Sequence, residues 1–402
     1  MTSGDWGLLD PAGISSFDLT SDDAVLTAMV DVERAILRAW GAEDQADPGV
    51  RPGESTRDAG SVTDAASVDR DTLRSGVVRD GVAVVALVGE LRAQLENSGA
   101  AADRLHAGAT SQDILDSALV LVARDALGRA RDDLAEAGTR LAGAADRYRS
   151  ALRLATTLGR SAAPSTLGIL FAGWLDSISS AIEALDRLRY PVQYAGPVGD
   201  GEQADRLARR IGASRDLRAR IAEILDLTDP KRSWQTDRTP ILEIAFGAAT
   251  VCASAGRIGR DLTAVSRDGS SEVELTGGGG SSAMAHKRNP VDAIGMTTAG
   301  LQAPGLLATI TASAVFADER PAGEWHAAWG PFRQLVRLAE SAAAGANRAV
   351  TGMTTRPEAS LAALDGASAI ARSDADTLDA AGPIVDAALT RFADISGREV
   401  RP

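Results

Sequence analysis

The chain has 402 residues and a formal net charge of −13, with 45% hydrophobic but only 4% aromatic residues. This length exceeds what one small core needs and predicts two or three subdomains. The acidic balance disfavours nucleic acid and anionic membrane surfaces as partners, whereas a local cluster of basic groups still permits a small anionic substrate.

The cellular location is predicted from cysteine use and from the absence of targeting patterns. Cys252 is the single cysteine, so no internal disulfide can form and a reducing cytoplasm is the expected compartment. The start, MTSGDWGLLDPAG, has neither a basic segment nor an apolar segment of the kind found in signal peptides. No run of about 18 uninterrupted apolar residues predicts a membrane span.

The first third of the chain alternates between helical and irregular patterns. Residues 23–41 carry apolar side chains at helical spacing and predict a helix that ends at Gly41. Residues 42–76 are rich in Asp, Gly, Ser and Pro and predict a long loop or weak helices. From 114 to 148 apolar residues recur every three or four positions without proline, which predicts one very long helix.

Four more long amphipathic helices are expected, rich in Ala and Leu. They are predicted at 166–189, at 239–265, directly after Pro290 and at about 329–349. Long helices with short breaks pack as a bundle, so the predicted fold class is all-α. The expected domains are an N-terminal helical domain (1–99), a central long-helix bundle (100–345) and a shortened C-terminal helical segment (346–402).

One local motif is the glycine-rich segment GGGGSSAMAHKRNP, residues 277–290. Consecutive glycines allow a mobile loop whose backbone N–H groups can turn toward an anion. Ser281 becomes a useful base only where its alkoxide is stabilised, which backbone amides, Lys287 and exclusion of water can do together. The alternative is a flexible linker before a helix at Pro290, whose ring the first turn tolerates.

A second motif, HAGATSQDILDS, opens the first very long helix at residues 106–117. Thr110, Ser111 and Gln112 offer hydroxyl and amide donors at a helix start, where the helix dipole favours a carboxylate. Asp113 or Ser111 is expected to cap that helix. His106, four residues before the donors, is a candidate acid or carboxylate ligand, with a structural role as the alternative.

These two motifs resemble the signature segments of the fumarase/aspartase superfamily. GSSAMAHKRNP is similar to its signature loop, and HAGATSQDILDS resembles the form found in bacterial 3-carboxy-cis,cis-muconate cycloisomerases and, more loosely, in adenylosuccinate lyases. Further segments resemble the cycloisomerase branch. They are PSTLG at 164–168 with AGW at 172–174, PVQ at 191–193, WQTDR at 234–238, and ER and WH within 319–326.

The resemblance implies roles for particular residues. Ser281 would be the general base that takes a proton beside a carboxylate, with Lys287 and Asn289 holding that carboxylate or the aci-carboxylate intermediate. Thr110, Ser111 and Gln112 would contact the substrate. Weaker correspondences imply substrate contacts from four further residues: Thr157, Gln235, Arg238 and Arg320. Arginine suits this task because its fork binds both carboxylate oxygens.

The resemblance also implies a homotetramer with sites shared between subunits, acting on a small polycarboxylate. Long apolar stripes that one subunit cannot bury agree with this expectation. The three histidines lack metal-ligand spacing, and His286 and His326 are expected to be structural. No nucleotide-binding glycine pattern follows a strand, so no metal and no cofactor are expected.

Four positions depart from the family pattern. Leu158 and Ser161 stand at the two positions where relatives often carry histidine, and Thr156 stands where an arginine is common. Ala285 replaces the loop proline, which should loosen the loop. The loop that carries Ser281 otherwise keeps the family pattern, whereas the positions expected to supply the general acid and a carboxylate-binding arginine differ from it.

Three functions therefore remain open. The first is a cycloisomerase that acts on a carboxylated muconate. The second is a lyase that releases fumarate from a succinyl adduct with an amine or nitro leaving group. The third is a catalytically silent helical oligomer.

Overall fold

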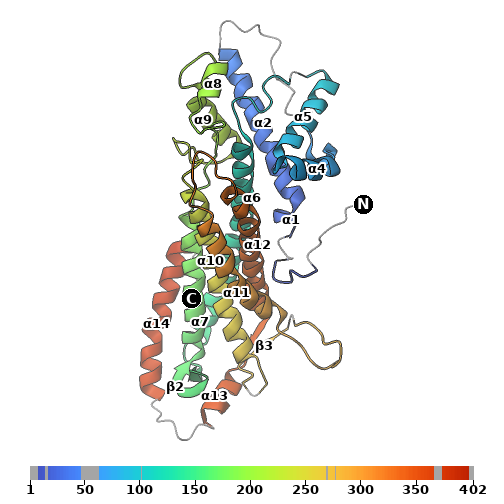
Figure 1. Cartoon of the computed structure of the whole chain (residues 1–402). Coiled ribbons are helices and arrows are strands. Elements are labelled where there is room, and N and C mark those ends of the chain that lie inside the picture. The colour runs from blue at the N-terminus through green and yellow to red at the C-terminus, as the bar shows by residue number, and fades with distance from the viewer. Residues whose placement is uncertain are drawn as a thin grey trace.

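The computed structural model describes residues 8–13, 17–46, 63–100, 102–268, 270–276, 278–365 and 374–397. These residues form an elongated bundle of long helices with two small two-stranded sheets (Figure 1). All five predicted long helices are present, which confirms the all-α class. They are α6 (Ser111–Arg147), α7 (Leu167–Asp186), α10 (Thr239–Val265), α11 (Val291–Ala312) and α12 (Glu324–Thr351).

Small residues let these helices approach closely. A side chain at Gly259 of α10 would lie 2.5 Å from the carbonyl oxygen of Ala293 on α11, and one at Gly256 would lie 3.1 Å from the Cα of Gly300. Neither position tolerates a Cβ without a backbone shift. The Ala- and Gly-rich composition is therefore a packing requirement of the bundle.

The N-terminal part begins with α1 (Phe17–Thr20) and α2 (Asp22–Ala46), followed by a 3₁₀ turn (Ala65–Ser67), α4 (Arg70–Asp80) and α5 (Val84–Ser98). The predicted end of the first helix at Gly41 was wrong, because α2 continues to Ala46. Trp40 and Gly41 are both buried, and this packing outweighs the cost of about 1 kcal/mol for glycine inside a helix. Of the segment predicted as a long loop or weak helices, 42–76, residues 47–62 lie outside the described residues, and the remainder includes the end of α2, the 3₁₀ turn and the start of α4.

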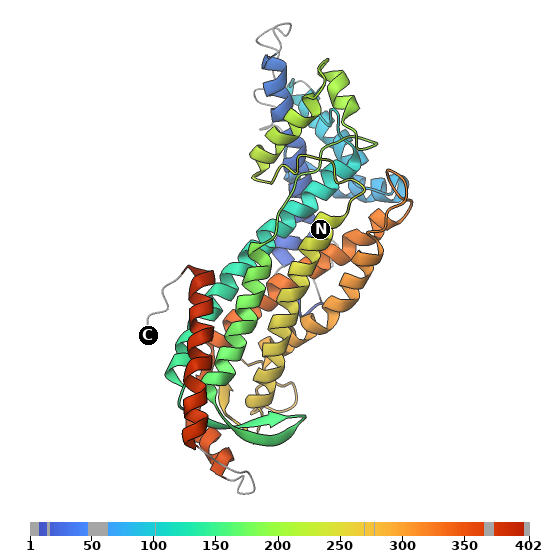
Figure 2. The same cartoon turned by 90° about the vertical axis from the view of Figure 1, so that its left-hand side faces the viewer.

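Two short helices were not predicted. Helices α8 (Glu202–Leu207) and α9 (Ala213–Leu225) lie between α7 and α10, and α9 packs on α2 at one end of the molecule. Helix α14 (Asp374–Ser396) packs along α7, as Figure 2 shows. The segment after residue 345 thus adds a helix to the bundle, and α12 itself continues through this position, so the three-domain division stays a prediction.

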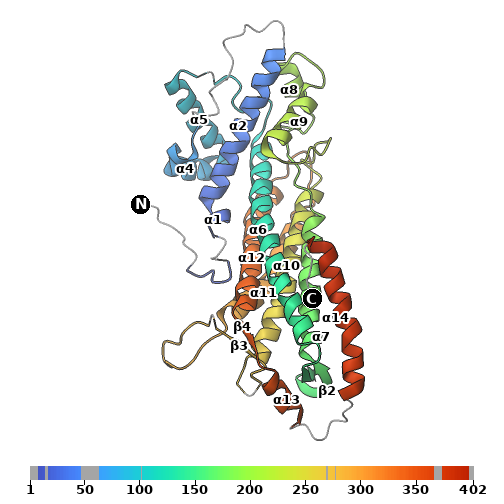
Figure 3. The same ribbon diagram turned by 180° about the vertical axis from the view of Figure 1, so that it is seen from behind.

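The two small sheets, of which only β1–β2 is a hairpin, lie toward the other end of the bundle. Strand β1 (Leu152–Thr157) pairs antiparallel with β2 (Arg160–Thr166), and β3 (Val273–Leu275) pairs with β4 (Met353–Thr355). Helix α13 (Pro357–Asp365) follows β4. Figure 3 shows α6 running from the α8–α9 end down to this hairpin end, so one helix connects both regions.

Two helices, α7 and α10, are long and apolar enough to cross a membrane by length and composition alone. In each, 56% of the most apolar window is buried inside the molecule. Both pack against other long helices of the bundle, as core helices do.

Candidate active site

The start of α6 is fixed by a reciprocal cap. Thr110 is the N-cap residue, and its N–H donates to Oδ2 of Asp113 at 3.0 Å. The fully buried Asp113 also accepts N–H groups from Ala195 (3.1 Å) and Gly196 (2.9 Å), which fastens the loop after α7 to this helix. The expectation that Asp113 serves the cap is confirmed, whereas Ser111 is the first residue of the helix and not its cap.

Burial has a strong electrostatic effect on Asp113. It raises the pKa of the carboxyl group to about 6, although the N–H groups of Gly196, Thr110 and Ala195 and the charge of His106 act in the opposite direction. The three donated N–H groups account for all the hydrogen bonds that the structure gives this side chain. Asp113 therefore positions the helix start and its neighbouring loop.

The turn before α6 is held from two sides. The carbonyl oxygen of Ala107 accepts from Nε1 of Trp40 at 2.9 Å and from the hydroxyl of Tyr194 at 2.8 Å. Gly108 has a φ of 71°, and a Cβ there would lie 2.6 Å from the Tyr194 oxygen, so only glycine fits. His106 itself has a φ of 59°, an uncommon conformation for a non-glycine residue.

His106 is paired with a buried carboxylate that the sequence patterns did not reveal. Its main-chain N–H lies 3.1 Å from Oε2 of Glu33, and its ring Nδ1 lies 2.7 Å from Oε1. Burial lowers the pKa of His106, but the hydrogen bond and charge of Glu33 raise it more, and the net shift is upward. Glu33 lies on α2, 73 residues earlier, so no local pattern links the two.

One turn further along α6, Asp116 lies at the centre of a buried polar cluster. Arg238, at the start of α10, donates from Nη1 to Oδ2 (2.5 Å) and from Nη2 to Oδ1 (3.0 Å). Nε1 of Trp325 and Nε2 of Gln112 complete the set at 3.0 and 3.2 Å. The Arg238 guanidinium is thus occupied by a carboxylate of the protein, which favours a positioning role over direct substrate contact.

The neighbouring predicted residues retain unused hydrogen-bonding capacity. Gln112 donates to the carbonyl of Gln235 (2.8 Å), and Gln235 donates to the carbonyl of Glu319 (2.8 Å). The side-chain oxygens of both glutamines are buried and accept no hydrogen bond. Within the described residues Arg320 forms no ion pair; its Nη2 donates to Oγ1 of Thr110 at 2.6 Å, and its buried Nε has no acceptor. These free groups can receive a polar ligand.

The glycine-rich segment forms a loop beside β3, described from residue 278 onward. Gly279 and Asn289 exchange both backbone hydrogen bonds (2.9 and 2.8 Å) and close the loop at its base. Oγ of Ser281 accepts N–H groups from Met284 (3.1 Å) and Ala283 (3.3 Å). Helix α11 begins at Val291 after this loop, as predicted, with Pro290 as its N-cap residue.

The charged side chains of this loop are open to solvent. Lys287 and His286 are both exposed, and among the described residues neither side chain has a hydrogen-bond or ion-pair partner. In the described part of the chain, no three His, Cys, Asp or Glu side chains gather in a group that could hold a metal ion. His326, also exposed, packs against the rings of Trp325 and Trp329.

Thr157 lies at the tip of the β1–β2 hairpin. It pairs with Arg160 across a two-residue turn of Leu158 and Gly159, both at positive φ (49° and 75°). Leu158 is fully exposed there, an unusual position for a large apolar side chain. The tip, including Ser161, carries neither a histidine nor a carboxylate.

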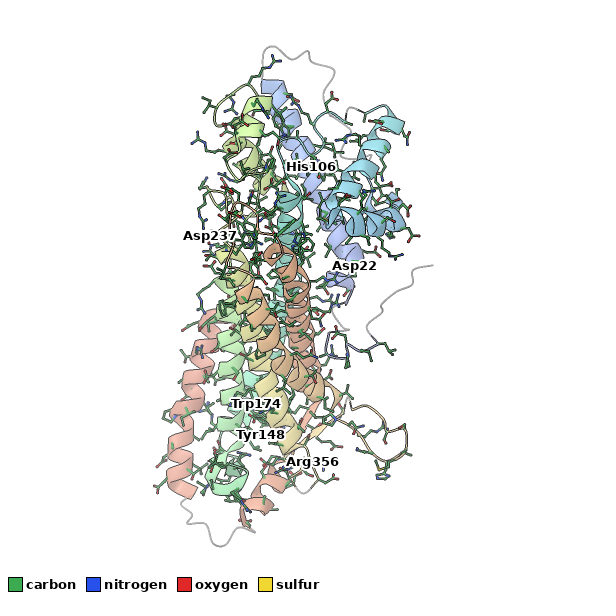
Figure 4. The ribbon with its side chains drawn as sticks, in the orientation of Figure 1. Asp22, His106, Tyr148, Trp174, Asp237 and Arg356 are labelled. Atoms are coloured by element: carbon green, nitrogen blue, oxygen red, sulfur yellow. The ribbon has the colours of Figure 1, made fainter. Side chains whose placement is uncertain are left out.

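Within one protomer, the predicted site residues fall into two groups that lie in opposite halves of the helical bundle. His106 lies near the α8–α9 end of the bundle, whereas Tyr148, Trp174 and Arg356 mark the opposite half (Figure 4). The loop of residues 278–290 and the β1–β2 hairpin belong to that opposite half (Figure 1). A single protomer therefore does not bring the Ser281 loop to the start of α6.

An open groove of about 630 Å³ lies between the end of α11 and the start of α12. It is lined mainly by small side chains, and none of the predicted site residues lines it. Its residues are Ala308, Thr309, Ala312, Ser313, Ala322, Gly323, Glu324 and Ala327.

Comparisons with known proteins agree with the two motifs. Residues 53–305 match a family model described as Lyase. The chain is 35% identical over 376 residues to nitrosuccinate lyase of Streptomyces davaonensis, covering 90% of this chain and 77% of that protein. It is 34% identical over 333 residues to 3-carboxy-cis,cis-muconate cycloisomerase of Pseudomonas aeruginosa, covering 80% and 69%.

Solved structures show the same fold. The 3-carboxy-cis,cis-muconate lactonizing enzyme from Pseudomonas putida superposes with a TM-score of 0.79 at 27% identity, covering 98% of this chain and 89% of that one.

Proposed function

Because this chain belongs to the lyase family whose model matches residues 53–305, and thereby to the fumarase/aspartase superfamily, we propose that Ser281 is the general base of its active site. The proposed reaction makes or breaks a bond on the carbon next to one that carries a carboxylate. Ser281 exchanges the proton of the carboxylate-bearing carbon, and Lys287 and Asn289 hold the negative charge that develops on the carboxylate.

The observation that carries this proposal is the pair of N–H groups directed at Oγ of Ser281. Hydrogen bonds to an oxygen favour its charged form, so these two donors lower the cost of forming the serine alkoxide. The exposed ammonium of Lys287, six residues along the same loop, adds a positive charge that a bound substrate would bring close. Closure over the substrate would exclude water and strengthen all of these interactions.

Substrate recognition is proposed at the start of α6. Thr110, Ser111 and Gln112 present polar groups at the positive end of a 37-residue helix, where a carboxylate is favoured. Arg320 adds a guanidinium without a carboxylate partner among the described residues, directly beside Thr110. His106, directly before the start of α6, exchanges a proton with the substrate bound there. These features suit a small polycarboxylate, and the chemistry requires no cofactor.

We further propose a homotetramer whose sites combine loops of different protomers. Within one chain the Ser281 loop and the start of α6 lie in different halves of the bundle, so a complete site needs a neighbour. Helix α11 carries no charged side chain after Asp292, yet Ile294 and Leu301 on it are 50% and 64% exposed. An apolar face of this kind is normally covered in an oligomer. The proposed compartment is the cytoplasm.

The leading substrate proposal is a carboxylated muconate. In this cycloisomerization a carboxylate oxygen of the substrate forms a bond to one alkene carbon, and the neighbouring carbon takes a proton from the Ser281 hydroxyl. In the reverse direction the Ser281 alkoxide removes that proton and the C–O bond breaks. Several relatives at about 30% identity or more carry the cycloisomerase name, and they support this assignment.

A second candidate is elimination of nitrite from a nitrosuccinate. Here Ser281 removes a proton, the C–N bond breaks, the electron pair leaves with nitrite, and fumarate remains. The favouring observation is the β1–β2 hairpin tip, where Leu158 and Ser161 offer no acid. A leaving group that departs as a stable anion needs none, and the relative in Streptomyces davaonensis bears the nitrosuccinate lyase name.

Ultraviolet absorbance distinguishes the two reactions. The purified chain is incubated separately with 3-carboxy-cis,cis-muconate and with nitrosuccinate. Loss of the muconate chromophore supports the leading proposal, and appearance of fumarate supports the second. If neither substrate is consumed by wild-type protein while the tetramer is intact, both substrate proposals fail and the silent oligomer is favoured.

A further inference from the structure

Glu33 is a buried carboxylate whose hydrogen bonds all come from one residue. Its side chain on α2 has no exposed surface, and it contacts the main-chain N–H and the ring Nδ1 of His106 at 3.1 and 2.7 Å. Among the described residues no arginine or lysine pairs with it. A buried carboxylate without a partner is strongly disfavoured, so His106 is the group that compensates Glu33.

This geometry assigns different tasks to the two ring nitrogens of His106. An ionised Glu33 can only accept, so Nδ1 carries a proton in both charge states of the ring. Nε2 is then the nitrogen that gains and loses a proton. The imidazole remains 22% exposed, so Nε2 has access to the space beyond the protein surface at the start of α6.

We propose that Glu33 is a positioning residue for proton transfer by His106. Glu33 fixes the ring orientation and holds the proton on Nδ1. In the elimination direction the charged ring gives its Nε2 proton to the departing carboxyl oxygen and becomes neutral, and in the cycloisomerization direction Nε2 takes that proton back as the oxygen forms its bond to carbon. Elimination of nitrite, which departs as a stable anion, does not need this proton. This proposal rests on the proposed function, because it needs a substrate at the start of α6.

The charges around the imidazole come from three helices. Glu33 of α2 and Asp113 of α6 favour the charged ring, whereas Arg92 of α5 and burial favour the neutral ring. The pKa of His106 is raised on balance, with Glu33 as the main cause of the upward shift. Removing the charge of Glu33 should therefore move the ring titration to lower pH.

The contact of Glu33 with the main-chain N–H of His106 also helps to hold that residue at positive φ, which is a structural role. Glu33→Gln separates the two roles. The amide oxygen can still accept the main-chain N–H of His106, while the amide NH₂ now faces Nδ1 and donates to it. The turn is kept, but the neutral ring must carry its proton on Nε2.

The test compares the pH dependence of kcat for four proteins. The variants Glu33→Gln and Glu33→Asp are measured beside the wild type and beside Glu43→Gln, a matched control on the same helix whose carboxylate pairs with Arg210 and Arg220 instead. Glu33→Gln should lower kcat about 10- to 100-fold with KM nearly unchanged, and should move the His106 limb of the profile to lower pH. Glu33→Asp should restore part of that shift, and Glu43→Gln should overlay the wild type.

The inference and the proposed function fail in different ways. If Ser281→Ala abolishes turnover but Glu33→Gln gives a wild-type profile, the inference is overturned and the proposed function stands. The ring can also be followed without turnover, because the chain has three histidines. In histidine-labelled protein, with the His106 signal assigned from His106→Asn, an unchanged ring titration in Glu33→Gln would overturn the inference even if Ser281 proved dispensable.

Discussion

The guanidinium of Arg238 and the carboxylate of Asp116 form a buried two-point ion pair, with Nη1–Oδ2 at 2.5 Å and Nη2–Oδ1 at 3.0 Å. Trp325 and Gln112 donate to the same carboxylate, so Asp116 joins the starts of three long helices, α6, α10 and α12. This cluster holds the region that contains Thr110 and Arg320. Its fixed geometry matters because a small displacement of binding groups lowers catalytic rates strongly.

Asp116→Ala should therefore destabilise the protein by about 3–5 kcal/mol, because it leaves the buried charge of Arg238 without its partner. Asp125→Ala provides a control on the same helix, since Asp125 and Arg124 form a half-exposed pair at the surface. This control should cost less than about 1 kcal/mol. Urea unfolding monitored by circular dichroism measures both values, and equal losses in the two variants would contradict the structural importance of the pair.

Ser281→Ala should reduce kcat by about 10²- to 10⁴-fold, because a positioned general base accelerates a reaction by this range. Assembly should not change, since the Ser281 side chain only accepts N–H groups inside its own loop. Ser282→Ala, which alters the next hydroxyl in the same exposed loop, should retain activity. Steady-state kinetics and light scattering check the pair, and full activity of Ser281→Ala would refute the assigned base.

The raised pKa of Asp113 predicts a specific pH dependence of stability. With a folded-state pKa of about 6 and an ordinary value of 3.8, the folded state binds more protons than the unfolded state between these values. The contribution of this group to the free energy of unfolding therefore falls as pH increases from 4 to 6, by roughly 2–3 kcal/mol.

Asp113→Asn removes this titration and keeps the shape of the side chain. The amide group adds a constant offset to the free energy of unfolding of the variant. Apart from this offset, the free energy of unfolding of the wild type minus that of the variant should fall as pH rises through this window. Because the charge of Asp113 also favours the charged His106 ring, the difference includes the loss of that interaction. Urea unfolding at several pH values measures the difference, and a pH-independent difference would argue against the raised pKa.

The exposed apolar face of α11 predicts that Leu301→Asp weakens the tetramer. Each buried leucine side chain contributes roughly 1.5–3 kcal/mol, and an aspartate in its place would bury a charge. Ile211→Asp is a matched control, because Ile211 is 92% exposed but lies between α8 and α9, away from α11. Light scattering should give a reduced mass for the first variant only. A tetramer that withstands Leu301→Asp would exclude this face as the interface.

Local sequence determined the long helices of this protein. Their apolar periodicity extends over 20 residues or more, and signals such as the residues around Pro290 and Thr110 mark where α11 and α6 begin. The motifs around His106 and Ser281 also predicted the two groups of candidate site residues, because their residue types and spacing are local properties of the chain.

Only the tertiary structure decided how these residues are used. Helix α2 continues past Gly41 because burial outweighed helix propensity, and α8 and α9, with 6 and 13 residues, were not predicted. Arg238 is paired with Asp116, 122 residues away, and His106 with Glu33, 73 residues away. Such contacts depend on how helices pack, which local spacing does not encode. The sequence therefore could not show that Arg238 is held by a carboxylate of the protein, whereas Arg320 has no carboxylate partner among the described residues.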